Sequence, residues 1–345
     1  MKRTSKPPAV YASAVFVFIL LALVVVLGPF DLGFLSGQTL AGSSRFFAAT
    51  PESLAASNQF TVEELRGLNQ VLHDAKFGDN TIILTHLNQA WAANGSMIEM
   101  FLRSFHEGIG TEKLLDHLVI VALDEPSFQR CVQVHKHCVV LKTEGVDFSG
   151  DQKSYMAEDY LKMMWRRIQL LSVVLELGYS FVFTDTDVLW FRDPFPRFHA
   201  GADFEIACDR FNGADADLSN PVNGGFLHVV SNSKTISLYK LWYESRLRFP
   251  GKHDQHVFDA IKLSPEFGAL GLNVRLLGTE YFGGFCEKAK DLDVVCTMHA
   301  NCCIGLEKKM MNLELVAEGW SLFKLMTPDQ RQHFQISWRA PVNCP

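Results

Sequence analysis

The longest apolar run of the chain lies at its N-terminus. Residues 9–30 contain no charged side chain, and as a helix they would span about 33 Å, close to the ~30 Å hydrocarbon core of a bilayer. Lys2, Arg3 and Lys6 precede the run, and such a positive flank stays in the cytosol. A cleaved signal peptide is the alternative, but its apolar region is normally only ~7–15 residues long. The pattern favours an uncleaved transmembrane signal anchor at 9–30, with residues 1–8 as a cytosolic tail.

Small and polar residues follow the anchor. Residues 31–60 are rich in Gly, Ser, Ala, Thr and Gln, which is typical of a flexible stem. We expect this stem to connect the anchor to a folded part of the chain on the far side of the membrane. That part is residues 61–345, where no internal repeat and no strong linker is visible, so it is expected to form one domain.

The periodicity then changes repeatedly between strand-like and helical. Thr61 and Glu64 have the spacing of a capping box, which marks the start of a helix. Short apolar runs indicate buried strands, and the amphipathic segments between them indicate helices. Strands that alternate with helices predict an α/β fold whose parallel strands are covered on both faces. The expected helices are 61–74, 96–106 and 155–177, and the expected strands are 81–85, 118–123, 138–141, 181–183, 225–230 and 294–298.

Composition supports a folded chain and excludes several classes of protein. Of the 345 residues, 48% are hydrophobic and 20% are charged, which rules out a disordered, collagenous or coiled-coil architecture. The formal net charge is -6, so there is no basic excess to neutralise a phosphate backbone. Nucleic acid is therefore not expected as a partner.

Eight cysteines suit the oxidising lumen that the predicted topology implies. Their pairing cannot be deduced from the sequence, and the doublet at 302–303 has no sequence-level explanation. His135, His137 and Cys138 imitate a metal cluster, but a strand edge with a buried or bridged cysteine is the simpler interpretation. Asn94 begins a glycosylation sequon, which is used only if the folded domain leaves it accessible.

Two aspartates follow a buried strand in the middle of the chain. Asp185 and Asp187 come directly after the apolar segment 181–183, and apolar residues resume at Val188. Side chains at i and i+2 of an extended chain point the same way, so both carboxylates are expected to face one site. Two close carboxylates repel each other unless a cation or a proton joins them, and hard divalent cations prefer oxygen ligands. Because ligands of open α/β sheets bind at the carboxyl ends of strands, the pattern predicts a cation site that a diphosphate would complete.

Two other interpretations fit the aspartate pair. The aspartates could simply cap the segment that follows them. Haloacid-dehalogenase-like phosphatases also place an Asp-x-Asp motif after a buried strand, with the first Asp as nucleophile. The residue after Val188 is Leu189, where that motif needs Thr or Val, and the pair lies deep in the chain. Both features argue against a phosphatase.

Polar residues elsewhere could complete the site. Asn223 precedes a predicted strand, Asp254 and Gln255 begin a predicted helix, and His299 ends a predicted strand. A lysine doublet at 308–309 follows soon after. An imidazole can complete a carboxylate metal site, and a lysine can neutralise a departing phosphate. Taken singly, each has a structural alternative as a core histidine, a helix cap or a solvated surface.

In this order the motifs resemble those of nucleotide-sugar glycosyltransferases of the GT-A fold, and most closely the plant-type glycosyltransferase family 77. The resemblance covers roughly residues 62–310 and implies a Rossmann-like mixed sheet flanked by helices. It rests on Asp-x-Asp at 185–187, Asn-Gly-Gly-Phe at 223–226, Pro-Gly-x-x-Asp-Gln at 250–255, His-Ala-Asn-Cys at 299–302 and the lysines beyond, with further similarity at 84–91, 178–179 and 191–195.

The resemblance implies a metal and diphosphate site. Asp185, Asp187 and His299 would bind Mn²⁺ on the diphosphate of a nucleotide sugar, and Asp185 would also reach the ribose. Lys308 or Lys309 would contact the diphosphate, and the doublet leaves open which one.

It also implies roles on the nucleotide and sugar sides. Thr85 and Asn88 would lie near the nucleotide, at the end of the first strand. Asn223, Asp254 and Gln255 would line the sugar and acceptor side as catalytic residues.

The expected function is metal-dependent, retaining transfer of a pentose or galactose-like sugar to a glycan or glycoprotein acceptor in cell-wall or glycan biosynthesis. An anchor and a stem are usual in Golgi members of such families, so we expect a single-pass type II Golgi membrane protein with a lumenal catalytic domain. A non-catalytic lumenal module that binds nucleotide sugars is the remaining alternative. The donor sugar and the acceptor depend on pocket shape, which the sequence does not display.

Overall fold

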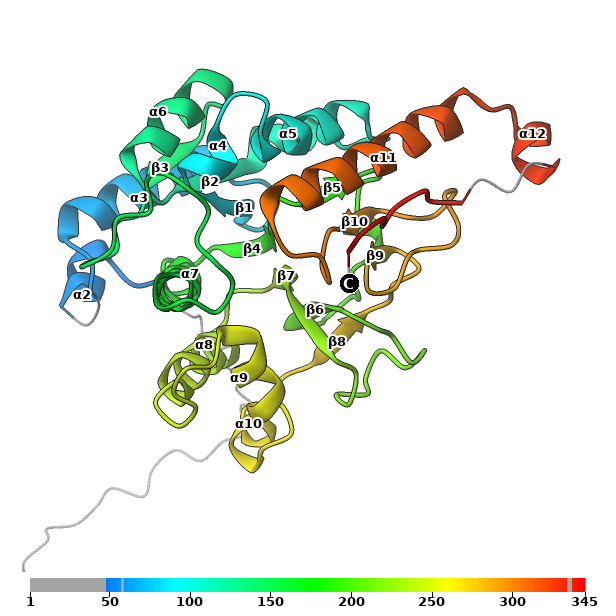
Figure 1. Cartoon of the computed structure of the whole chain (residues 1–345). Coiled ribbons are helices and arrows are strands. Elements are labelled where there is room, and N and C mark those ends of the chain that lie inside the picture. The colour runs from blue at the N-terminus through cyan, green and yellow to red at the C-terminus, as the bar shows by residue number, and fades with distance from the viewer. Residues whose placement is uncertain (1–47, 57–58, 334–336, 345) are drawn as a thin grey trace, which may run out of the picture. The chain divides into compact units, whose positions relative to one another are not determined.

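The computed structural model describes residues 48–56, 59–333 and 337–344 (Figure 1). These residues belong to one compact unit, Phe46–Pro345. The predicted cytosolic tail, the predicted transmembrane helix and most of the predicted stem lie outside the described residues. Within the described ranges, no helix combines the length and hydropathy that a membrane span requires.

The end of the predicted stem contains a short helix, α2 (Pro51–Ala55). Its N-cap is Thr50, whose hydroxyl oxygen accepts a hydrogen bond from the Ser53 amide at 3.3 Å. Leu54 is buried in the core of the unit. A capping threonine, a proline in the first turn and one buried apolar side chain stabilise this turn of helix near the end of the segment predicted as stem.

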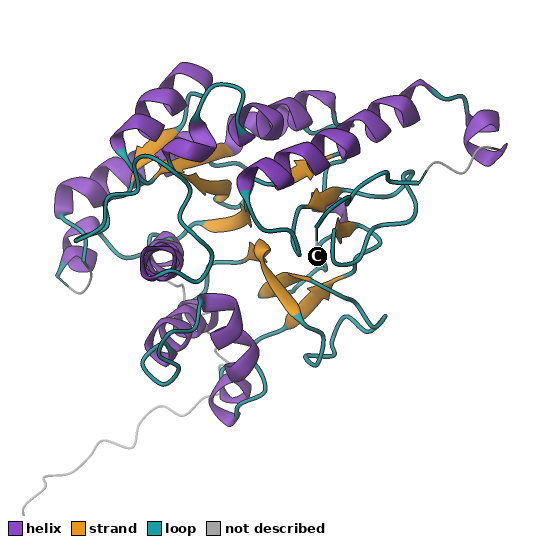
Figure 2. Ribbon diagram, viewed as in Figure 1, coloured by secondary structure: helices purple, strands orange, loops and turns teal. Residues whose placement is uncertain are grey.

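A seven-stranded sheet forms the centre of the unit (Figure 2). Its first four strands in spatial order are mutually parallel, whereas β7 runs antiparallel to both of its neighbours, so the sheet is mixed. Apolar runs do not encode strand direction, which is why the pattern alone predicted parallel strands. The order is β3 (Cys138–Val140), β2 (Leu118–Ala122), β1 (Thr81–Leu87), β4 (Ser180–Thr184), β7 (Val222–Val229), β6 (Phe204–Cys208) and β8 (Val274–Leu277).

A second sheet of three strands lies beside the first. Its central strand, β10 (Thr297–His299), pairs antiparallel with β5 (Val188–Trp190) and parallel with β9 (Phe282–Gly284). β4 and β5 are consecutive in the chain but belong to different sheets, so residues 185–187 form the crossing between the two sheets.

Helices cover both faces of the large sheet (Figure 1). Ile82 and Leu84 of β1 pack with the helices of one face, and Ile83 packs with those of the other, as the alternation of a strand requires. The first face is covered by α3 (Val62–Ala75), α7 (Glu158–Glu176), α8 (Ser233–Ser245), α9 (Asp254–Ile261) and α10 (Pro265–Ala269), and the other by α4 (Gln89–Ala92), α5 (Met97–Glu107), α6 (Glu125–Val134) and a 3₁₀ turn at Glu112–His117.

The small sheet packs on α11 (Leu306–Leu325) through a third apolar cluster that includes Leu189, Met298 and Trp320. Two shorter elements complete the described fold, a 3₁₀ turn at Phe195–Arg197 and α12 (Pro328–His333). The expected α/β fold with a mixed sheet flanked by helices is confirmed.

All of the expected helices and strands are present, with shifted ends. The capping box holds: the Glu64 amide donates to the Thr61 hydroxyl at 3.1 Å, and the Thr61 amide donates to the Glu64 carboxylate at 2.8 Å. The segment around Asn223 was expected to precede a strand, but it lies inside β7, which begins at Val222. The strand expected at 294–298 is the shorter β10.

Three disulfides resolve the cysteine pattern, namely Cys131–Cys138, Cys286–Cys302 and Cys303–Cys344. The doublet at 302–303 therefore fixes one turn of chain to two different segments. The first bridge confirms the bridged-cysteine interpretation of the region around Cys138. Cys208 and Cys296 are buried thiols, so the eight cysteines are not fully paired.

Candidate active site

The site lies where the two sheets meet. Residues 185–187 leave β4 of the large sheet and enter β5 of the small one. β5 pairs with β10 so that Val188 is opposite His299, and the Ala300 amide donates to the Asp187 carbonyl at 3.0 Å. This pairing brings an imidazole that is more than 100 positions away in the sequence beside the two aspartates.

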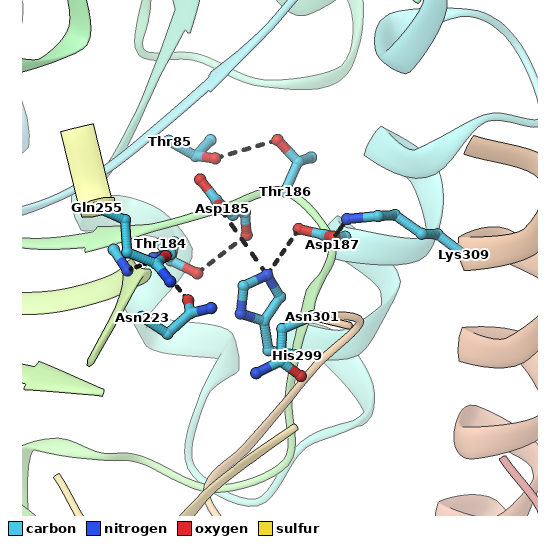
Figure 3. A network of polar contacts seen from close by, with 12 residues as sticks. Thr85, Thr184, Asp185, Thr186, Asp187, Asn223, Gln255, His299, Asn301 and Lys309 are labelled. Atoms are coloured by element: carbon cyan, nitrogen blue, oxygen red, sulfur yellow. Dashed lines mark hydrogen bonds and ion pairs between the residues drawn. The ribbon is translucent and has the colours of Figure 1, made fainter. Parts of the chain in front are cut away.

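Two carboxylates and one imidazole converge there (Figure 3). His299 Nε2 is 3.3 Å from Asp187 Oδ1 and 3.8 Å from Asp185 Oδ2. The three ligand atoms all lie within 4.8 Å of one another, and Asp187 and His299 are buried. Two hard oxygens and one nitrogen at this spacing fit a divalent cation such as Mn²⁺.

Lys309 supplies the positive charge nearest to Asp187. Its Nζ lies 2.5 Å from Asp187 Oδ2. Figure 3 marks this ion pair with a dashed line. Burial opposes ionisation of Asp187, but Lys309 and His299 outweigh it and hold the pKa of this carboxyl well below its usual range. Lys308, one position earlier on α11, has an exposed side chain. The geometry therefore places Lys309, and not Lys308, at the candidate site.

Asp185 is joined to a second carboxylate through Arg167 of α7. The guanidinium contacts Asp185 Oδ1 at 3.1 Å and forms a buried ion pair with Asp254, the first residue of α9. Burial raises the pKa of Asp185 despite Arg167, and the nearby Asp187 charge raises it further. Burial also opposes ionisation of Asp254, but Arg167 prevails and lowers its pKa to about 2. The sequence analysis missed Arg167, although a basic pair inside the buried face of the helix predicted at 155–177 was a visible signal.

Asn223 and Gln255 are held by an aspartate that the sequence analysis also missed. Asp209 accepts hydrogen bonds from Asn223 Nδ2 at 2.8 Å and from Gln255 Nε2 at 3.3 Å. It accepts a third from Asn301 Nδ2 at 2.9 Å. Gln255 Oε1 in turn accepts from the Gly224 amide at 3.2 Å. Since Asp209 follows β6 with no motif around it, its role is apparent only in three dimensions.

Gly225 of β7 forms the floor between the ligands. A Cβ at this position would lie 2.4 Å from His299 Cε1 and 2.6 Å from Asp185 Oδ2, closer than real Cβ atoms approach other atoms. Only glycine fits without displacing one of these side chains.

Thr85 and Asn88 take different positions. Thr85 is fully buried, and its hydroxyl lies 3.2 Å from that of Thr186, so it supports the aspartate turn through Thr186 (Figure 3). Asn88 lines a hollow, although its Nδ2 donates to the Phe148 carbonyl at 2.9 Å. Asn88 is thus in a position to meet a ligand, whereas Thr85 does not line the hollow.

Two hollows meet at Asp185, and both are lined by Tyr160, Met164, Asp185 and Lys309. The first, of about 140 Å³, is lined by His86, Asn88 and Trp91. The second, of about 450 Å³, holds most of the sugar-side candidates, namely Asn223, Asp254, Gln255 and His299, beside Tyr155 and Tyr160. The charged groups between the hollows are therefore accessible from both.

A second group of metal-type side chains, Asp209, Cys286 and Cys302, lies near the larger hollow. Both of its cysteines are consumed by their disulfide, so the group is not a thiolate metal site. The bridge instead anchors the turn between His299 and Lys309.

Comparison with known proteins supplies the family context. A family model described as nucleotide-diphospho-sugar transferase matches residues 113–313. An uncharacterized protein of Arabidopsis thaliana is 47% identical over 312 residues, which cover 90% of this chain and 82% of that protein. The UDP-D-xylose:L-fucose alpha-1,3-D-xylosyltransferase 3 of Arabidopsis thaliana is 25% identical over 187 residues, covering 53% of this chain and 45% of that protein.

Solved structures are more distant. A galactosyltransferase in complex with donor and acceptor sugar analogues aligns with a TM-score of 0.44 and 13% identity, over 73% of this chain and 99% of that one. Mouse xyloside xylosyltransferase 1 aligns with a TM-score of 0.39 and 14% identity, over 64% of this chain and 98% of that one.

Proposed function

This chain belongs to the nucleotide-diphospho-sugar transferase family, and we propose that it transfers a pentose or galactose-like sugar to a glycan or glycoprotein acceptor with the help of a divalent metal ion. The observation that carries the proposal is the convergence of Asp185, Asp187 and His299 beside Lys309. The distant similarity to named xylosyltransferases supports a pentose donor.

Asp185, Asp187 and His299 would hold Mn²⁺, because their atoms offer two hard oxygens and one imidazole nitrogen at bridging distance. When bound, the ion would act as a Lewis acid toward the diphosphate. Lys309 lies on the same side and stabilises the negative charge that grows on the departing nucleoside diphosphate. In the reaction, the bond from the anomeric carbon to the diphosphate oxygen breaks, a bond to an acceptor oxygen forms, and the acceptor proton is released.

We assign the smaller hollow to the nucleotide and the larger one to the sugar and acceptor. Asn88 would contact the nucleotide, and Thr85 would hold the aspartate turn in place. On the sugar side, the low pKa of Asp254 keeps it ionised, so it can stabilise positive charge at the anomeric carbon but has no proton to donate. Its buried Oδ1 lies 3.5 Å from His253 Nδ1, and Arg167 holds its other oxygen, so the protein itself fixes the orientation of this carboxylate.

Asn223 and Gln255, whose side-chain amides both donate hydrogen bonds to Asp209, would orient the sugar or the acceptor. The resemblance to family 77 supports retention of anomeric configuration, and we assign no covalent nucleophile. Membership of the transferase family favours glycosyl transfer over the phosphatase alternative. A phosphatase would also need Asp185 as a free nucleophile, whereas here it is bonded to Arg167.

We further propose that the protein is a single-pass type II Golgi membrane protein that acts in cell-wall or glycan biosynthesis. The apolar run at 9–30 and its positive flank support this topology. The three disulfides agree with an oxidising lumen. Asn94 is exposed, so a lumenal chain should carry a glycan there that Asn94→Gln removes. An unmodified Asn94 together with a cytosolic C-terminus in protease protection would contradict the topology.

The test of the activity is a donor screen on the purified full chain in detergent. UDP-xylose, UDP-galactose and UDP-arabinose are supplied separately with Mn²⁺, and release of nucleoside diphosphate is measured with and without EDTA. We expect release from one donor that EDTA abolishes. Full activity in EDTA would remove the metal from the mechanism, and phosphate release from a generic phosphomonoester would favour a phosphatase.

A further inference from the structure

A groove of about 770 Å³ runs along α7, between residues 142–144 on one side and the C-terminal end of α8 with residues 246–252 on the other. The helices α7 and α8 lie side by side (Figure 1). The groove is separate from the two hollows of the candidate active site and shares no lining residue with them. Neighbouring residues of α7 point to different places: Arg167 lines the larger active-site hollow, and Arg166 lines the groove.

The groove is locally basic on a chain whose net charge is -6. Five basic and three acidic side chains line it. Two of the acids are already engaged, Glu64 in the cap of α3 and Glu158 with Lys162 at 2.8 Å. Four of the cations have no carboxylate within ion-pair distance in the described part of the chain: Lys142, Arg166, Arg246 and Lys252.

Arg166 gives the groove a buried charge. Arg166 is 7% exposed, and its guanidinium lies 3.9 Å from the centre of the Phe60 ring. It donates to the backbone carbonyls of Gln59 at 3.0 Å and Lys142 at 3.2 Å. Carbonyl oxygens satisfy its hydrogen bonds but do not neutralise its charge. The positive charge of Arg166 would therefore attract an anion bound in the groove.

Aromatic rings lie between these cations. Trp165, Tyr243 and Phe249 are partly exposed in the groove, and the ring centres of Trp165 and Tyr243 are 6.4 Å apart. The Arg246 guanidinium lies 3.6 Å from the centre of the Tyr243 ring. An aromatic face packs against the apolar C–H face of a sugar ring, while guanidinium and ammonium groups bind its carboxylate.

One short segment lies between the groove and the larger active-site hollow. Gly251 and Lys252 line the groove, and the next residues, His253 and Asp254, line the larger active-site hollow. Trp165 Nε1 donates to the Lys252 carbonyl at 3.2 Å, which fixes this segment against α7. An acceptor glycan bound in the groove would therefore lie next to the segment that also lines the active-site hollow.

We propose that this groove along α7 binds an acidic, uronic-acid-containing stretch of the acceptor glycan. This inference rests on the proposed function only in taking the acceptor to be a glycan. The aromatic rings, and a position next to the segment that lines the larger active-site hollow, favour an acidic sugar chain over the other anionic surface available to such a protein, a phospholipid headgroup.

The experiment measures binding of a galacturonic acid hexamer to the purified full chain by calorimetry, without donor. The fully methyl-esterified hexamer is the neutral counterpart. The double variant Lys142→Gln/Lys252→Gln removes two exposed charges of the groove, and Lys113→Gln/Lys136→Gln removes two exposed charges outside it. We expect the acid to bind at least fivefold more tightly than its ester, and the groove variant to lose most of that difference while the control variant keeps it.

Equal binding of acid and ester, or equal losses in both double variants, would overturn the proposal. So would binding of phosphatidylserine vesicles that the groove variant loses, if the hexamer does not bind. Asp187→Ala should leave hexamer binding unchanged, because Asp187 does not line the groove. Hexamer binding without any donor turnover would therefore count against the proposed function alone, and donor turnover without hexamer binding against this inference alone.

Discussion

The guanidinium of Arg167 and the carboxylate of Asp254 form an ion pair in the interior of the protein, with 6% and 1% of their side chains exposed. The pair ties α7 to the first turn of α9. Because Arg167 also contacts Asp185, it links the metal side of the candidate site to the sugar side. Removal of this one cation would leave two carboxylates without their shared partner.

We expect Arg167→Ala to destabilise the fold by about 3–5 kcal/mol, since it leaves a buried charge uncompensated. The free energy of unfolding in urea measures this. Arg66→Ala is the control, because the Arg66–Glu52 pair is 66% and 54% exposed and should contribute less than about 1 kcal/mol. An equal decrease in the free energy of unfolding in the two variants would show that the buried pair stabilises the fold no more than the exposed pair does.

Acid should reduce the contribution of ionised Asp254 to the stability of the fold. Its pKa is about 2 in the folded chain, against ~3.9 for an unperturbed aspartate, so the unfolded chain binds its proton first as the pH falls. The stabilisation is complete above pH ~4 and is lost as the pH falls toward 2. We would measure the free energy of unfolding in urea from pH 6 to 2.5. The difference in this free energy between the unaltered protein and Asp254→Asn should become smaller as the pH falls, and a difference that stays constant or grows would contradict the prediction.

The metal site can be tested through two of its ligands. Asp187→Ala should reduce metal-dependent transfer by at least about 10²-fold while the chain still folds, because the variant loses a carboxylate ligand. His299→Ala should retain some transfer but require about tenfold more Mn²⁺ for half-maximal rate. Donor turnover over a Mn²⁺ titration measures both effects. Asp193→Asn serves as the control, because Asp193 lines neither hollow. If the Mn²⁺ titration of His299→Ala is unaltered, His299 is not a metal ligand.

The lysine doublet provides a matched pair. Lys309→Ala should lower kcat by about 10–10²-fold, since its Nζ lies beside Asp187 where the diphosphate charge would develop. Lys308→Ala, which removes an identical but exposed charge one position away, should leave kcat nearly unchanged. Similar losses in both would indicate a general charge effect of α11 instead of a specific contact.

The disulfides should differ in what they support. Cys302→Ser releases the turn between His299 and Lys309 from Cys286. We therefore expect the Mn²⁺ concentration for half-maximal rate to rise several-fold, in addition to a lower Tm. Cys131→Ser opens a bridge away from both hollows and should lower only Tm. Measuring Tm and the Mn²⁺ titration on both variants separates these effects. An unchanged titration in Cys302→Ser would show that the metal site does not depend on the Cys286–Cys302 disulfide.

Local signals were sufficient where the chain itself carries the information. The apolar run of β4 ends in Asp185 and Asp187, and the cap of α3 is complete within four residues, so both were predictable. β6 was missed because it contains Glu205, a charge that is buried only because His199 and His228 contact it from elsewhere in the chain.

The candidate site shows the same division. Its motif residues were found, but the partners that hold them were not. Arg167 and Asp209 belong to no motif, and each gains its role from side chains brought near by the tertiary fold. The strand direction of β7 was likewise invisible, because antiparallel and parallel neighbours require the same buried apolar residues.

Gly225 couples the candidate ligand set to the backbone of β7. Because it carries no side chain, Asp185 and His299 approach the main chain of β7 more closely than any other residue at this position would allow. A substitution at 225 would therefore alter the spacing of both candidate ligands without removing either one. Position 225 is thus a place where ligand geometry can be changed while the chemistry of the ligands stays the same.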